Sequence, residues 1–272
     1  VYKRQNFQAE FSFICVATPQ DETGSADLSI VFDVVKSLSE SAAPNSVVVT
    51  KSTVPVGTGA QLQARLGRGD VFISSNPEFF REGTALKDFM EPDRIVAGAN
   101  SPGVAERVLG LYSSIDTAKI ATSLESAELI KYSANAYLAM RLSYVNDIAA
   151  LAESLGADVV DVLEGMGLDK RIGTAFLKPG PGWGGSCFPK DTQALLASAR
   201  NIGVELPLVA SAIDSNENAL HRVVETIAEI VGGSVRDKTI AIWGIAFKAN
   251  TDDIRDSPAV AAMRLLVDKG SK

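Results

Sequence analysis

Histidine and cysteine are scarce in this sequence, which has one histidine and two cysteines among 272 residues. His221 reads as a surface residue of a helix, so the histidine partner of a thiol hydrolase is lacking. Cys15 and Cys187 lie in different segments, which argues against a disulfide framework, and one histidine cannot easily complete a zinc site. We therefore expect no metal, and a reducing, cytoplasmic location that keeps a working thiol free.

Long apolar runs and excess positive charge are also missing. No stretch of about 18 apolar residues occurs, and no signal peptide is visible in Val1–Gln5, so we expect no membrane span. The net charge of −7 argues against a general nucleic-acid partner, although an anionic small substrate is compatible with local clusters of Lys and Arg. The apolar content of 46% supports a sizeable core and more than one domain.

Short apolar runs alternate with helical patterns in the first part of the chain. Strands are predicted at residues 11–17, 46–50, 71–74 and 94–97, and helices at 27–41, with Asp27 as N-cap, and at 61–66. Alternation of this kind indicates an α/β fold with a parallel sheet and helices on both faces.

Polar turns follow three of these predicted strands. They are Thr18-Pro19, Lys51-Ser52-Thr53 and Asn76-Pro77-Glu78. Ligands of parallel sheets bind beyond the carboxyl ends of the strands, where all three turns are expected to meet. One such turn alone would be ordinary loop chemistry, but three at one edge favour a binding site.

A long helix is predicted next, because no Gly or Pro interrupts the chain from a capping box at Thr122–Glu125 to the stop at Gly156. About 33 residues make a helix of roughly 50 Å, with an Ala-rich face suited to a twin helix in another subunit. Lys131 and Asn135 are four residues apart and share a face, as catalytic groups or as a solvated stripe.

Further helices are predicted at 159–166, 192–202 and 207–230, the last as one or two segments. Residues 237–244 read as a new strand, and Ser257-Pro258 opens a helix, which together begin a second nucleotide-binding unit. The expected domains are an incomplete Rossmann-like domain at 1–121, a central all-helical domain at 122–218, and the connecting helix and start of a second Rossmann-like domain at 219–272.

The most informative segment surrounds Cys187. Two glycines, Gly184 and Gly185, precede the thiol and are expected to bring the backbone close to a ligand, and Lys190-Asp191 follow it. A small, unobstructed thiol beside a cation and an acid indicates a nucleophile. The alternative is a buried structural cysteine, which is the interpretation we give to Cys15.

Five segments together resemble the UDP-glucose/GDP-mannose dehydrogenase family, over about residues 11–270. They are KSTVPVGT at 51–58, NPEFFREGTALKDFMEPDRIVAG at 76–98, ELIKYSANAYLAMRLSYVNDIAALAE at 128–153, RIGTAFLKPGPGWGGSCFPKDT at 171–192 and GIAFKANTDDIRDSPA at 244–259. Phe188 and Lys190-Asp191 look like the branch of the family that acts on UDP-glucose.

The resemblance implies a reaction of polysaccharide biosynthesis, the oxidation of a sugar primary alcohol to a carboxylate by two hydride transfers to NAD. The aldehyde would be captured by a cysteine as a thiohemiacetal and then pass to a thioester, which water cleaves. The substrate implied is UDP-glucose. GDP-mannose and UDP-N-acetylmannosamine remain alternatives, as does a homodimer-forming fragment without activity. A homodimer through residues 123–155 is the expected assembly.

Residue roles follow from the same resemblance. The catalytic group would comprise Cys187 as nucleophile, Lys131 and Asn135 at the oxygen where charge develops, Asp191 as acid/base, and Thr53 and Glu78 ordering a water. The NAD site would use Thr18, Pro19, Ser52, Glu82 and Arg255. The UDP-sugar site would use Glu78, Phe79, Phe80, Glu82, Lys131, Asn135, Arg171, Phe176, Leu177, Lys178, Trp183, Gly184, Phe247 and Lys248.

The family's first β-α-β unit, with its GxGxxG turn, does not occur in the sequence. That unit would precede Phe11, and most of the second nucleotide domain would follow Lys272. We therefore expect the chain to be an internal fragment, in which Val1–Gln5 do not resemble the missing unit.

Overall fold

The computed structural model of the chain describes residues 9–21 and 23–272, so Val1–Gln5, which do not resemble the family's first unit, lie outside the described part. The chain divides into two compact units, Val1–Ser133 and Ala134–Lys272. One helix, α5 (Leu124–Leu155), contains the point of division.

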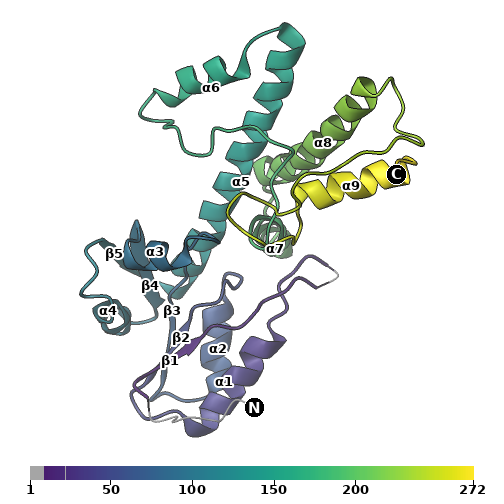
Figure 1. Ribbon diagram of the computed structural model, residues 1–272. Helices are drawn as coiled ribbons and strands as arrows, with labels where there is room; N and C mark the ends of the chain where they lie inside the picture. The colour runs from purple at the N-terminus through teal and green to yellow at the C-terminus, as the bar shows by residue number, and fades with distance from the viewer. Residues whose placement is uncertain (1–8, 22) are drawn as a thin grey trace. The chain divides into compact units, whose positions relative to one another are not determined.

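The first unit is built on a five-stranded sheet in the order β1-β2-β3-β4-β5 (Figure 1). The strands are β1 (Phe11–Ile14), β2 (Val47–Thr50), β3 (Phe72–Ser75), β4 (Arg94–Ala99) and β5 (Ala118–Thr122). Four of them were predicted, whereas β5 and the short helix α3 (Ala85–Met90) were not. The α/β class is confirmed.

The prediction of an all-parallel sheet is wrong at one pairing. Strands β1, β2 and β3 run parallel, and so do β4 and β5, but β3 and β4 are antiparallel. A parallel neighbour needs a crossover connection, usually a full helix, whereas α3 has only 6 residues. The chain therefore returns in the opposite direction after β3.

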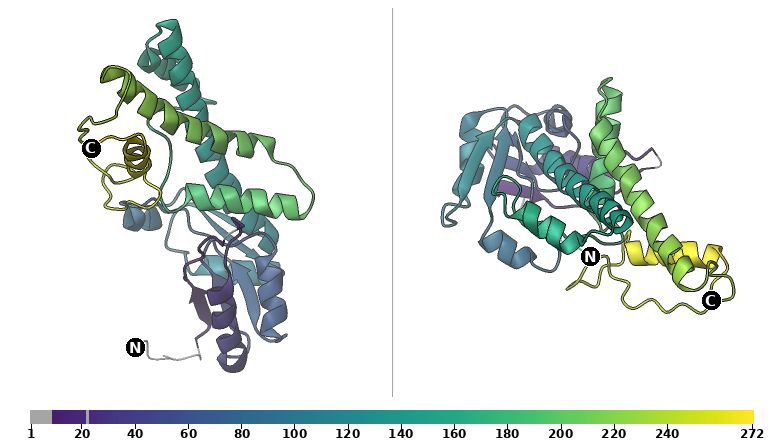
Figure 2. Two further views of the ribbon diagram at one scale, coloured as in Figure 1. Left: turned by 90° about the vertical axis from the view of Figure 1, so that its right-hand side faces the viewer. Right: turned by 90° about the horizontal axis from the view of Figure 1, so that it is seen from above.

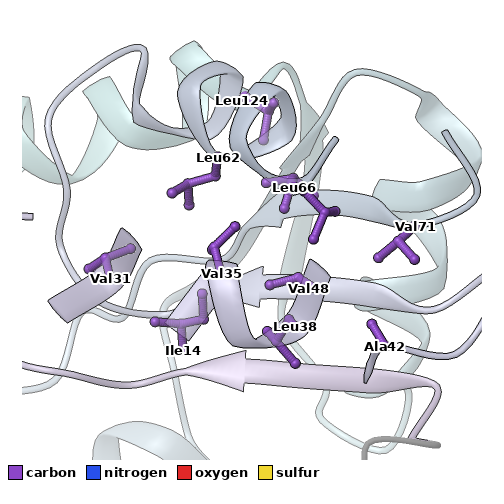
Figure 3. Close-up of a cluster of buried hydrophobic side chains, with 11 residues drawn as sticks. Ile14, Val31, Val35, Leu38, Ala42, Val48, Leu62, Leu66, Val71 and Leu124 are labelled. Carbon is purple, nitrogen blue, oxygen red and sulfur yellow. The ribbon is translucent and has the colours of Figure 1, made fainter. Parts of the chain in front are cut away.

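Successive side chains of β2 point to opposite faces of the sheet, so this strand contributes to two hydrophobic cores. Val48 points into a core formed with α1 (Ser29–Ser41) and α2 (Thr58–Leu66), and Val47 and Val49 point into a core with α4 (Pro102–Gly110). Because helices cover both faces, the strand has no polar position until Thr50 and appears in the sequence as an unbroken apolar run. Figure 3 shows the first of these cores, in which Leu62 and Leu66 of α2 lie near Leu124 of α5.

Two helix starts differ from the predictions by one residue. The N-cap of α1 is Leu28, but Asp27 still accepts a hydrogen bond from the Ser29 amide at 2.8 Å. Ser123 rather than Thr122 caps α5, because Thr122 is the last residue of β5, and the Ser123 hydroxyl accepts from the Ser126 amide at 3.2 Å.

The long helix itself is confirmed. Helix α5 has 32 residues, which is about 48 Å at 1.5 Å per residue. It stops at Gly156, whose φ of +70° is the left-handed conformation that favours glycine after a helix.

Cys15 was predicted in the core, and this is wrong, since its side chain is exposed. Strand β1 ends at Ile14. Beyond it, the backbone groups of Val16 bond to the Ser52 hydroxyl instead of the backbone of a neighbouring strand. The hydroxyl accepts a hydrogen bond from the Val16 amide at 2.9 Å and donates to the Val16 carbonyl at 2.6 Å. The predicted strand of residues 11–17 is thus cut to four residues.

The second unit is mainly helical (Figures 1 and 2). After α5 come α6 (Val159–Gly167), α7 (Phe188–Asn201), α8 (Pro207–Ile230) and α9 (Pro258–Asp268). Helix α8 is one continuous segment and packs with α9 around Val224 and Leu266. A second cluster joins α5 to α6 through Val145 and Leu163.

The strand predicted at 237–244 does not form, although the helix expected after Ser257-Pro258 does. A strand requires a partner along its length, and among the described residues the backbone bonds of 237–244 to residues 270–272 involve just Gly270 and Lys272, with the Asp237 amide donating to the Gly270 carbonyl at 2.8 Å. The Lys272 amide donates to the Lys238 carbonyl at 2.8 Å, and the Ile240 amide donates to the Lys272 carbonyl at 2.9 Å, which is the pattern of a parallel pair one residue long.

Among the described residues, no helix is both long and apolar enough to cross a bilayer. No group of three or more His, Cys, Asp or Glu side chains among them is arranged to hold a metal ion.

A buried carboxylate ties α5 to the amino end of α2. Glu128, which is 2% exposed, accepts hydrogen bonds from the Gly57 amide at 2.6 Å and the Gly59 amide at 2.7 Å. Burial raises the pKa of Glu128 from 4.5 to about 7, against the opposing effect of these amides. The folded protein therefore binds a proton that the unfolded chain releases at lower pH.

This linkage predicts a pH-dependent stability. Because the folded-state pKa lies above the unfolded value, the free energy of unfolding should fall by about 3 kcal/mol as pH rises from about 4.5 to about 7, and then level off. Urea titrations of the wild type and of Glu128→Gln measure the difference. The exposed Glu106→Gln, on α4, serves as control. An identical pH dependence in wild type and Glu128→Gln would contradict the assignment.

Candidate active site

The three predicted turns do meet at the carboxyl edge of β1, β2 and β3. Thr18, which is buried, donates its hydroxyl proton to the Thr53 carbonyl at 2.9 Å. Ser52 is joined to Val16 as described above, and the Pro19 carbonyl accepts the Asp27 amide at 2.8 Å. The edge is therefore a continuous polar ledge, as the parallel order of these three strands requires.

Lys131 and Glu78 form an ion pair within the first unit. The Lys131 ammonium is 3.4 Å from the Glu78 carboxylate, and its side chain is 4% exposed. The other Glu78 oxygen accepts the Phe80 amide at 2.6 Å, which fixes the carboxylate in its own loop. The same ammonium lies 5.5 Å from the centre of the Phe79 ring. A buried cation thus faces a carboxylate that is only partly covered.

The sequence places Lys51 in one of the three turns of this edge but assigns it no role, and the structure shows its contacts. Its ammonium donates to the Asn76 side chain at 3.1 Å and lies 5.6 Å from both the Phe80 and the Tyr112 ring centres. Burial lowers the pKa of Lys51 to about 8, against the opposing charge of Glu78. Its position directly after β2 was the available signal, because the ligand-facing loops of such an edge start where the strands end.

Glu82 lies in the turn that follows Phe80 and is half-buried. This turn leads into α3, and Arg81 beside it is bound by Asp88 of that helix.

Cys187 occupies the N-cap position of α7 in the second unit. Its side chain is half-buried, and the Ser186 hydroxyl lies 3.7 Å from the sulfur. The amino end of a helix carries partial positive charge, which favours an anion such as a thiolate at this position. The structure therefore presents the thiol at a helix end that suits a nucleophile.

Asp191 stands one turn into the same helix with no exposed surface. Its carboxylate accepts a hydrogen bond from the Asn135 side chain at 2.6 Å and one from the Lys190 ammonium at 2.5 Å. The sequence placed Asn135 and Asp191 in one site, and the structure brings these two side chains into direct contact. Asn135 lies on α5 one turn after Lys131.

The paired glycines, which were expected to bring the backbone close to a ligand, lie against a loop of the same chain. A Cβ on Gly184 would lie 1.8 Å from the Asp256 carbonyl oxygen, and one on Gly185 would lie 2.5 Å from the Phe247 ring. The Gly185 amide donates to the Arg255 carbonyl at 3.1 Å. The glycines thus admit the 247–256 loop against the segment that carries the thiol.

The other predicted ligand residues of the second unit differ in exposure. Arg171 and Lys178 are exposed, with Arg171 paired to Asp169, whereas Leu177 is buried in the core with Val145. Trp183 is also buried.

Three further predicted ligand residues are Phe176, which lies beside α7, and Lys248 and Arg255, which lie on the 247–256 loop. The Phe176 ring lies 6.5 Å from that of Phe188. Lys248 and Arg255 are exposed, and Arg255 pairs with Asp253 at 2.7 Å.

The fold and these two groups of residues define a nucleotide-binding α/β protein with a presented thiol. Three domain signatures of one family match the chain, namely the NAD binding domain at residues 1–116, the central domain at 125–218 and the UDP binding domain at 241–272. The chain belongs to the UDP-glucose/GDP-mannose dehydrogenase family, which confirms the resemblance.

Curated relatives agree with this assignment. UDP-glucose 6-dehydrogenase TuaD of Bacillus subtilis is 44% identical over 268 residues, which cover 97% of this chain and 58% of that protein. UDP-glucose 6-dehydrogenase of Rhizobium meliloti is 44% identical over 271 residues, covering 96% and 62%. The chain thus spans about three fifths of the length of these relatives.

Solved structures show the same fold. A UDP-glucose dehydrogenase from the archaeon Pyrobaculum islandicum is 38% identical with a TM-score of 0.89, over 96% of this chain and 62% of that one. A UDP-D-ManNAc dehydrogenase from Pyrococcus horikoshii is 26% identical with a TM-score of 0.86, over 96% and 64%.

The sheet edge fits one part of a dinucleotide. Its loops are tied together by Ser52 and Thr18, and the cations Lys51 and Lys131 stand beside them, so the edge offers polar groups and positive charge where parallel sheets bind nucleotides. The glycine-rich turn that would hold a diphosphate is not in the sequence.

The docking of the 247–256 loop on Gly184 yields a prediction. Gly184→Ala would place a methyl group into the Asp256 backbone, so the loop must move and the free energy of unfolding should fall by about 1–3 kcal/mol. Urea unfolding and proteolysis within residues 245–256 measure both effects. Gly180→Ala is the control, since its added Cβ meets no atom within 4 Å. Equal behaviour of the two variants would refute the docking role.

Proposed function

We propose that the protein is an NAD-dependent UDP-glucose 6-dehydrogenase, which oxidises UDP-glucose to UDP-glucuronate in two steps. The observation that carries this proposal is the thiol of Cys187 at the amino end of α7, one turn before a fully buried Asp191 held by Asn135. Relatives at 44% identity that bear this name support the choice of reaction.

The reaction needs a base, a nucleophile and groups that stabilise a developing oxyanion. In our proposal Asp191, acting through a water, removes the alcohol proton, while Lys131 and Asn135 stabilise the oxygen. NAD, when bound, accepts the hydride that leaves the sugar carbon in each oxidation. Cys187 attacks the aldehyde to form a thiohemiacetal, and the second oxidation turns this into a thioester.

Hydrolysis then releases the carboxylate and restores the thiol. Thr53 and Glu78 would order the attacking water, and Glu78 is suited to this role because one of its oxygens is held by the Phe80 amide while its side chain is 27% exposed. Water supplies the second oxygen of the carboxylate, so two hydrides leave for each sugar oxidised.

Binding roles are assigned by the family resemblance. Thr18, Pro19, Ser52, Glu82 and Arg255 would hold NAD, and Glu78, Phe79, Phe80, Glu82, Lys131, Asn135, Arg171, Phe176, Leu177, Lys178, Trp183, Gly184, Phe247 and Lys248 would serve the UDP-sugar. Because the side chain of Leu177 is buried, its backbone groups would make the contact with the UDP-sugar. Domains at 1–121, 122–218 and 219–272 would divide these tasks.

A second substrate remains a candidate on the same machinery. The structural neighbour from Pyrococcus horikoshii, described as acting on UDP-D-ManNAc, shares the fold at 26% identity. Initial rates with UDP-glucose, GDP-mannose and UDP-N-acetylmannosamine separate the alternatives, and we expect the highest kcat/KM with UDP-glucose.

The state of the cysteines bears on the cellular compartment of the protein. Both cysteines are free, which suits a reducing compartment, and we place the protein in the cytoplasm. Its product would supply sugar acids for polysaccharide biosynthesis.

We propose a homodimer through α5. Tyr137, Tyr144 and Leu151 are each more than half exposed and recur every seven residues, so they form one apolar stripe along the helix. A row of large apolar side chains of this length is unusual on a solvated face and fits the same row of a second copy.

Replacing the centre of the stripe tests the dimer. Tyr144→Arg should shift the protein from dimer to monomer in sedimentation experiments, because two buried charges would face each other across the two-fold axis. Glu153→Arg, on the opposite face of the same helix, should leave the dimer intact. A dimer that persists unchanged in Tyr144→Arg would exclude this interface.

Stoichiometry tests the reaction. We expect two NADH per UDP-glucose consumed, and Cys187→Ala should lower the rate of the four-electron reaction by at least about 10³-fold, because no thioester can form. Cys15→Ala, which changes an exposed cysteine, should retain full activity. One NADH per sugar, or full turnover in Cys187→Ala, would overturn the mechanism.

A further inference from the structure

Asn216 of α8 binds both backbone polar groups of one residue, Trp183, in the segment that carries the thiol. The Trp183 amide donates to the Asn216 side-chain oxygen at 2.7 Å, and the Asn216 side-chain nitrogen donates to the Trp183 carbonyl at 3.0 Å. One amide side chain thereby satisfies the donor and the acceptor of a single residue, as a neighbouring strand would.

The indole of Trp183 is anchored separately. Its ring nitrogen donates to the Ser143 hydroxyl at 2.9 Å, and that hydroxyl donates to the Ala212 carbonyl at 2.6 Å. Trp183 is 7% exposed, so both polar contacts are shielded from water. The residue is therefore fixed at its backbone by α8 and at its side chain by α5.

The anchored indole touches the first residue of α7. The Trp183 and Phe188 rings pack edge to face, with centres 6.3 Å apart and planes at 85°. Phe188 follows Cys187 directly, so the start of α7, where the thiol sits, rests against the anchored ring.

The glycine before Trp183 fits only this arrangement. Gly182 has a φ of +122°, and a Cβ there would lie 2.9 Å from the Asn216 oxygen. The close approach of Asn216 to the backbone is thus built into the sequence on both sides of the contact.

We propose that Asn216 is a positioning residue for the Cys187 thiol, acting through the backbone and indole of Trp183. It does not touch the reacting atoms. Without it, the segment 182–187 loses its attachment to α8, and the half-buried sulfur becomes more accessible and less well placed. The catalytic consequence rests on the proposed function, but the positioning of the thiol does not.

The test measures the thiol itself. In a Cys15→Ser background Cys187 is the only cysteine of the sequence, so its alkylation by iodoacetamide can be followed alone. We expect Asn216→Ala to raise the alkylation rate at least threefold, and Asn216→Asp, which keeps the acceptor but loses the donor, to give a smaller increase. Asn218→Ala, an exposed asparagine two residues along the same helix, should match the parent.

Fluorescence gives an independent readout. The two tryptophans are the buried Trp183 and the fully exposed Trp243, so a Trp243→Phe background isolates Trp183. We expect a red shift of its emission in Asn216→Ala and in Ser143→Ala, with thermal unfolding recorded to establish that each variant is folded. In the complete enzyme kcat should fall at least tenfold in Asn216→Ala, and KM for the sugar should rise as well, because Trp183 and Gly184 are assigned to the sugar site.

An alkylation rate in folded Asn216→Ala or Asn216→Asp equal to that of Asn218→Ala, with unchanged Trp183 emission, would overturn the proposal. The alkylation assay uses neither NAD nor a sugar. If the protein failed to oxidise UDP-glucose while Asn216→Ala still changed thiol reactivity, the proposed function would fall and the positioning role would stand.

Discussion

The contact between Asn135 and Asp191 is the interaction on which the second unit's site depends. A carboxylate without exposed surface is costly unless charged or polar groups compensate it, and here an amide from α5 and the neighbouring Lys190 do so. Because Asp191 lies one turn into α7, this contact fixes the amino end of that helix. The position of Cys187 at the N-cap follows from it.

Buried polar side chains that are compensated by a partner also occur elsewhere on one face of α5. Glu128, Lys131 and Asn135 share this face, and all three are buried. Glu128 holds the amino end of α2, Lys131 pairs with Glu78, and Asn135 holds Asp191. Each partner comes from a distant part of the sequence. One helix therefore organises both the sheet edge of the first unit and the thiol segment of the second.

Much of the fold was predictable because its signals are local. The run Val47–Val49 indicated a strand covered on both faces, and the uninterrupted chain up to Gly156 indicated the long helix. The sequence could not show the reversed direction of β4, since this depends on how a short connection closes in space. It could not show that residues 237–244 lack a strand partner.

The candidate site likewise contains residues that the sequence predicts and residues that it does not. Cys187, Asp191, Lys131 and Glu78 stand in recognisable motifs. In the structure Asn135 contacts Asp191, and Lys131 contacts Glu78. Residues that act by holding others carry no such motif. Asn216 and Ser143 became visible only through their contacts, as did the packing of Gly184 against Asp256, which lies 72 residues away.

The central claim is that Cys187 forms a covalent bond with the substrate carbon, and mass spectrometry tests it most directly. The enzyme in its Glu78→Gln form, in which hydrolysis should be slow, is mixed with UDP-glucose and NAD, quenched in acid and digested. We expect an adduct with the mass of a UDP-glucuronyl group on the peptide that contains Cys187, and only when NAD is present. No adduct on that peptide, or an equal adduct on the peptide of Cys15, would contradict it.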